Sequence, residues 1–140
     1  MRLVLVACFL SFLSSRSIAM DEPKKEPEPT TVRVLDVKVA GTAPGRFGDP
    51  TVITSPDELA KSVKDEAAVA AVGKSVDFKS EKVVYFAWMG SGQDKVTFAG
   101  DAKIDAEQTF TYAPGRTRDF RPHHKLFALP KDAKFKVVVP

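Results

Sequence analysis

The sequence predicts an α+β domain in which one antiparallel sheet of about six strands packs against one amphipathic helix. Three observations predict this class. One capped segment with helical periodicity stands in the middle of the chain, and short runs rich in β-branched and aromatic residues flank it. Turns that contain Gly or Pro separate those runs. We expect a single domain over residues 32–140.

The first predicted strand opens this domain. Leucine and valine alternate with charged residues within residues 31–40, which is the period-two pattern of a half-buried strand. Residues 41–50 contain two Pro, three Gly and one Asp, so we expect a loop there. A short strand follows over residues 51–54.

The helix carries the clearest local signal in the chain. Ser55-Pro56-Asp57-Glu58 is a capping box with Pro at the first helical position, where the serine hydroxyl and the Glu58 carboxylate satisfy unpaired backbone N–H groups. Apolar residues then recur at helical spacing, at Leu59, Val63, Ala67 and Ala70. Gly73 can end the helix. The pattern predicts one helix from Pro56 to about Val72.

The remaining elements are strand-like. Seven consecutive apolar residues, at positions 83–89, predict a central strand that is buried on both faces. Residues 90–94 predict a turn with two glycines, and Gly100-Asp101 predicts another. Further strands are expected around Val96 and Phe98, and over residues 109–112, 126–129 and 135–139.

The first nineteen residues have the pattern of a secretory leader. Arg2 precedes an apolar run over residues 3–13, and Ser17 and Ala19 are small residues at the positions that a signal peptidase reads. We therefore expect cleavage before Met20 and a periplasmic or secreted protein. Leu5-Val6-Ala7-Cys8 also matches a lipobox, which would anchor the protein through a lipid on Cys8. Only seven residues precede that cysteine, and the apolar run continues beyond it.

Residues 20–31 predict an extended tether, because they contain three prolines, alternating charges and almost no large apolar side chain. Without the leader the net charge falls from +3 to +1, because Arg2 and Arg16 leave with it. So small an excess argues against general binding to nucleic acid or to an anionic membrane. Cys8 is the only cysteine, so residues 20–140 have no disulfide or thiol nucleophile, which favours a bacterial exported protein.

One segment concentrates the positive charge. Residues 114–125 contain four Lys or Arg residues and one acid, and their Pro and Gly residues predict a loop or a stiff hairpin end. Arginines interleaved with an aromatic residue suit the recognition of an acidic protein surface. The candidate binding residues are Arg116, Arg118, Phe120, Arg121, His123 and Lys125, and the turn at 90–95 is a second candidate contact. The alternative is a solvated loop whose arginines pair with acids of the same domain.

A different function class would use the two histidines. His123 and His124 with Asp94 or Asp119 would form a small extracytoplasmic metal-binding protein or hydrolase. Adjacent residues of a strand face opposite sides, which opposes chelation by both histidines. The chain contains no Gly-x-Ser-x-Gly elbow and no phosphate-binding loop ending. A third reading is a ligand-binding sheet that uses Trp88 and Tyr85.

Several stretches resemble the C-terminal domain of PrcB, a subunit of a bacterial protease complex. They are Val-Ile-Thr-Ser-Pro-Asp-Glu-Leu at 52–59, Val-Asp-Phe at 76–78, Lys-Val-Val-Tyr-Phe-Ala-Trp-Met-Gly at 82–90 and Leu-Phe-Ala-Leu-Pro-Lys at 126–131. Gly90-Ser91-Gly92 only approximates the glycine-rich continuation of that family. The resemblance implies a non-enzymatic domain that associates with an exported protease, and it carries over no catalytic residue.

Pro-Gly-Arg-Thr-Arg-Asp at 114–119 is also similar to small secreted planctomycete-type proteins of unknown function. The two resemblances together cover about Thr51 to Val139. We expect an exported, non-catalytic binding or accessory domain that contacts a protein partner and needs no cofactor or metal.

Overall fold

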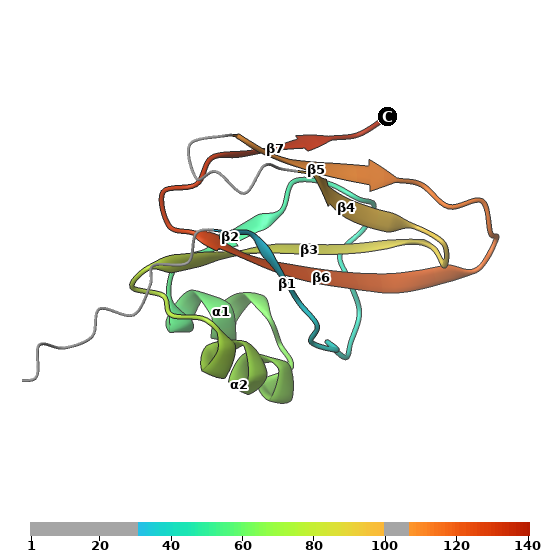
Figure 1. Cartoon of the computed structure of the whole chain (residues 1–140). Coiled ribbons are helices and arrows are strands. Elements are labelled where there is room, and N and C mark those ends of the chain that lie inside the picture. The colour runs from blue at the N-terminus through green and yellow to red at the C-terminus, as the bar shows by residue number, and fades with distance from the viewer. Residues whose placement is uncertain (1–30, 100–106) are drawn as a thin grey trace, which may run out of the picture.

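The computed structural model describes residues 31–99 and 107–140, and these residues form an α+β fold (Figure 1). The predicted class is confirmed. In chain order the elements are β1 (Arg33–Leu35), β2 (Thr51–Ile53), α1 (Pro56–Ser62), α2 (Glu66–Ser75), β3 (Glu81–Ser91), β4 (Lys95–Ala99), β5 (Gln108–Ala113), β6 (Phe120–Pro130) and β7 (Phe135–Val138).

The elements form three layers (Figure 1). A four-stranded sheet in the order β1-β6-β3-β2 lies in the middle, with both helices on one face and a three-stranded sheet, β4-β5-β7, on the other. All strand pairs are antiparallel except β5 and β7. The predicted antiparallel sheet is thus present, but its strands are divided between two stacked sheets.

The central strand β3 explains this layering. Val83 and Tyr85 belong to the core under the helices, whereas Val84, Phe86 and Trp88 belong to the core between the two sheets. Neighbouring residues of a strand point to opposite faces, so a strand between two cores needs a continuous apolar run. The prediction that residues 83–89 form a strand buried on both faces is confirmed.

The predicted single helix is wrong in one respect, because the chain forms two helices with a break at residues 63–65. Val63 adopts an extended conformation, and the Asp65 side chain accepts hydrogen bonds from Ala67 N and Ala68 N as the cap of α2. The same carboxylate accepts a hydrogen bond from Ala40 N at 2.7 Å. A capping acid inside a helical pattern can therefore start a new helix when a neighbouring loop also binds it.

Other predicted boundaries shift as well. The first strand is confined to residues 33–35, although Val37 and Val39 still pack against the core. Gly73 lies inside α2 and does not end it. The strand predicted at 126–129 is the end of the longer β6.

Three expectations lie outside the described residues. They are the leader, the tether before Thr31 and the turn at Gly100-Asp101. Among the helices in the described ranges, none has the length and apolar character needed to cross a membrane.

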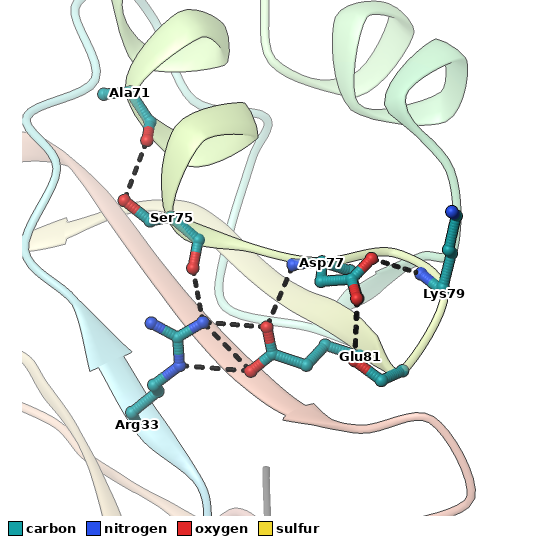
Figure 2. Close-up of polar contacts among 7 residues, drawn as sticks. Arg33, Ala71, Ser75, Asp77, Lys79 and Glu81 are labelled. Carbon is teal, nitrogen blue, oxygen red and sulfur yellow. Dashed lines mark hydrogen bonds and ion pairs between the residues drawn. The ribbon is translucent and has the colours of Figure 1, made fainter. Parts of the chain in front are cut away.

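An ion pair between the buried Glu81 and the partly exposed Arg33 joins the start of β3 to the edge strand β1 and the end of α2 (Figure 2). Glu81 is only 3% exposed, and its carboxylate binds the Arg33 guanidinium at 2.8 Å and accepts a hydrogen bond from Asp77 N at 3.1 Å. The same guanidinium donates to the carbonyl oxygen of Ser75, the last residue of α2. A buried carboxylate needs such partners because it has lost its hydration.

Candidate functional site

The positively charged segment predicted as a loop is half loop and half strand. Residues 114–119 connect β5 to β6, and residues 120–125 are the first part of β6. Of the two predicted forms, a loop or a stiff hairpin end, the loop is therefore wrong for residues 120–125, which belong to a strand. They pair in register with β3, from Ser91 opposite Phe120 to Phe86 opposite Lys125. We call residues 114–125 the basic end, because they lie at the end of the long β3–β6 pair away from the helices (Figure 1).

The basic end is tied to the turn between β3 and β4. Ser91 Oγ lies 2.6 Å from Thr117 Oγ1 and accepts a hydrogen bond from Thr117 N at 3.0 Å. Gly92 N donates to Asp119 Oδ1 at 3.1 Å. A side-chain hydrogen bond from Thr117 to Asp119, followed by this bond from Gly92, holds the pKa of the Asp119 carboxyl below its usual value. A Cβ on Gly115 would lie 2.5 Å from Ser91 Oγ, so the loop needs glycine there. The structure thus brings together the two segments that the sequence offered as contacts.

The cations of the basic end point into solvent. Phe120 is 70% exposed, the largest exposed fraction among the large hydrophobic residues of the described chain. Arg121 pairs with Asp119 at 2.6 Å. Arg116, Arg118 and Lys125 are exposed and form no ion pair with any described residue. Among residues 31–99 and 107–140, the alternative in which the arginines pair with acids of the same domain therefore applies to Arg121 alone.

The two histidines face opposite sides of the middle sheet, as expected. His123 stacks on Trp88 with ring centroids 4.8 Å apart, and its Nε2 lies 2.7 Å from the carbonyl oxygen of Ser91. His124 stacks on Tyr85, and its Nδ1 lies 2.7 Å from the tyrosine hydroxyl. No group of three or more potential metal ligands occurs within residues 31–99 and 107–140. The structure therefore does not bring the two histidines to one site.

Asp94 is a buried hydrogen-bond acceptor at the centre of this end. Its Oδ2 accepts from Trp88 Nε1 at 3.0 Å and from the Tyr112 hydroxyl at 2.8 Å, and its Oδ1 accepts from Gly115 N at 2.6 Å. Burial alone would raise the pKa of Asp94, but these hydrogen bonds outweigh it and lower the pKa. Burial and this carboxylate raise the pKa of Tyr112 to about 12. A Cβ on Gly90 would lie 1.9 Å from Asp94 Oδ2.

Sequence reasoning missed a cleft on the helical side of the middle sheet. The cleft has a volume of about 600 Å³. Its walls come from the loop 39–44, from the start of β2, from the junction between the two helices, and from the middle sheet. Besides the loop, the lining residues are Asp49, Thr51, Ser62, Lys64, Tyr85, Ala87 and His124. One signal was available in the sequence. Ala87 is the small residue among the larger side chains that β3 presents on this face.

Comparison of the chain with protein-family models, with curated proteins and with solved structures finds no match. The resemblance to the PrcB domain therefore stays a prediction.

Proposed function

We propose that this protein is an exported, non-catalytic accessory domain that binds an acidic surface of a partner protein through the basic end. The observation that carries the proposal is the exposed side chain of Phe120, 70% of which faces solvent on a paired strand. Aromatic residues and arginine are the residue types that contribute most to protein interfaces. A large apolar side chain flanked by cations fits an apolar depression with an acidic rim.

Charge supports the choice of an acidic partner. Residues 20–140 carry +1 and the basic end carries +3, so the rest of those residues carries −2. That −2 lies in the predicted tether, so the domain outside the basic end has no net charge. A partner with acidic groups would therefore be attracted to the basic end more than to the rest of the domain, which favours one orientation and speeds association. Twelve residues are a short patch for a nucleic-acid backbone, so a protein surface is the better match.

The rigidity of the basic end also supports binding. Hydrogen bonds from Thr117 to Ser91, from Gly92 to Asp119 and from Gly115 to Asp94 fix the loop before any partner arrives. A preorganised surface loses less conformational entropy on association than a mobile loop does. The predicted leader and the resemblance to PrcB point to an exported protease as the partner.

Photo-crosslinking in the cells that make the protein tests this proposal. A benzoylphenylalanine placed at position 120 should give a discrete adduct with one exported protein. The same group at Thr97, on the exposed side of β4, is the control position. The charge reversal R116E/R118E should abolish the adduct, whereas K38E/K131E, which removes equal charge from exposed positions elsewhere, should preserve it.

Three results would contradict the proposal. They are an equal adduct from position 97, an adduct that survives R116E/R118E, and an adduct with lipid or nucleic acid. Metal analysis of the purified protein tests the second function class independently, because stoichiometric zinc that is lost in H124A would favour a metal-binding protein.

A further inference from the structure

We propose that the cleft at Tyr85 and His124 binds a small zwitterion of the amino-acid or short-peptide class. This ligand site includes His124 of the basic end but none of its other residues, and it does not rest on the proposed protein partner. Its volume of about 600 Å³ lies within the range of small-molecule sites in proteins.

The cleft exists because the helical layer ends before the sheet does. Tyr85 is buried in the core under the helices, and Ala87, one step further along the same face of β3, is only partly buried against that core; both residues line the cleft. Ala87 pairs with His124 of β6, so a methyl group and an imidazole stand opposite each other. A larger residue at position 87 would fill the space that the loop 39–44 encloses from the other side.

The hydroxyl oxygen of Tyr85 can act as a hydrogen-bond acceptor for a ligand in the cleft. In the tautomer of His124 that is protonated at Nε2, this nitrogen faces the carbonyl oxygen of Gly41 at 3.5 Å, and that oxygen can only accept. Nδ1 is then unprotonated, and the Tyr85 hydroxyl donates to it at 2.7 Å. The phenolic oxygen keeps its lone pairs, which can accept a hydrogen bond from an ammonium or amide group of a ligand.

The charges at the cleft are balanced. Lys64 and Asp49 are its two fully charged lining residues, and both are exposed. An ammonium can only donate to the ligand and a carboxylate can only accept, so the pair complements a molecule with one group of each sign. The aliphatic lining, which includes Val39 and Ala43, suits a short apolar part between those groups.

Amide NMR shifts of the purified protein test this inference with three probes. L-alanyl-L-alanine carries both charges, N-acetyl-L-alanine carries only the carboxylate, and L-alaninamide carries only the ammonium. We expect saturable shifts at Ala87 and His124 with the dipeptide, and an affinity about tenfold lower for either single-charge probe. Y85F and K64M should each weaken dipeptide binding, whereas K61M, an equal change on the exposed side of α1, should not.

Any of three outcomes would overturn the inference. The first is that the dipeptide causes no saturable shift at Ala87 and His124, and the second is that the three probes bind with equal affinity. The third is that Y85F and K64M bind the dipeptide as tightly as the unaltered protein does. The NMR spectrum of Y85F reports whether its fold is retained, because the phenyl ring keeps the packing of the tyrosine ring. If Y85F is not folded, K64M decides the outcome, because Lys64 is exposed.

Discussion

Asp94→Asn should destabilise the protein by about 2–4 kcal/mol, although it changes only one atom of the side chain. The carboxylate accepts three hydrogen bonds, two at Oδ2 and one at Oδ1. If the amide nitrogen replaces Oδ1, it meets Gly115 N–H. If it replaces Oδ2, it meets Trp88 Nε1–H. In either orientation at least one donor loses its partner.

The magnitude follows from these contacts. A buried donor without a partner costs about 1–3 kcal/mol, and the bonds that survive lose the strengthening given by a charged acceptor. Asp94 is 8% exposed, so water cannot replace the lost bonds easily. Asp36→Asn is the matched control, because that aspartate is exposed, and it should change the free energy of unfolding by less than about 0.5 kcal/mol.

Urea unfolding monitored by circular dichroism measures both variants. The low pKa of Asp94 also fixes the pH dependence of the effect. A carboxyl with a lowered folded-state pKa stabilises the fold above its unfolded pKa of about 3.9, and this stability is lost as pH falls through the folded pKa. The difference between Asp94→Asn and the unaltered protein should therefore shrink below about pH 4. Equal unfolding free energies at neutral pH would refute the role of Asp94 as a buried acceptor.

Three further predictions concern the two tyrosine hydroxyls, the ion pair between Arg33 and Glu81, and Gly115. Burial raises the pKa of both Tyr85 and Tyr112, so near-ultraviolet titration should detect almost no phenolate at about pH 10. The free energy of unfolding should fall as pH rises through the folded-state pKa of Tyr112 at about 12. Arg33→Met leaves the Glu81 carboxylate buried without its cation and should lower the free energy of unfolding in urea by about 1–3 kcal/mol. The loss stays in this range because the Arg33 side chain is 43% exposed, so the pair is only partly desolvated. The double variant R33M/E81M should recover most of that loss. Gly115→Ala places a Cβ 2.5 Å from Ser91 Oγ and 2.7 Å from the Gln93 backbone, so hydrogen exchange at Thr117 N–H should accelerate, and unchanged exchange would contradict the close packing.

The sequence predicted the elements that depend on local pattern. The apolar run at 83–89 required a strand between two cores, and the adjacent positions of His123 and His124 required opposite faces. The division into two helices was not predictable in this way. The second role of Asp65, as acceptor for Ala40 N, depends on a loop that is distant in sequence.

The candidate site was predicted only in part. The charge of the basic end was visible in the sequence, but the pairing of its second half with β3 depends on tertiary register. Asp94 was considered as a partner of a histidine, whereas its donors come from three separate positions, Trp88, Tyr112 and Gly115. The cleft at Tyr85 was missed because its walls come from five segments that only the folded chain brings together.

The dissociation constant of the partner captured from position 120 tests the central claim most directly. Measured with purified components, it should rise by about tenfold or more in R116E/R118E and in Phe120→Ala, because both remove exposed groups of the basic end. Added salt should weaken the binding of the unaltered protein, and K38E/K131E should bind as tightly as that protein does. If R116E/R118E and Phe120→Ala bind the partner as tightly as K38E/K131E, the basic end is not the contact surface.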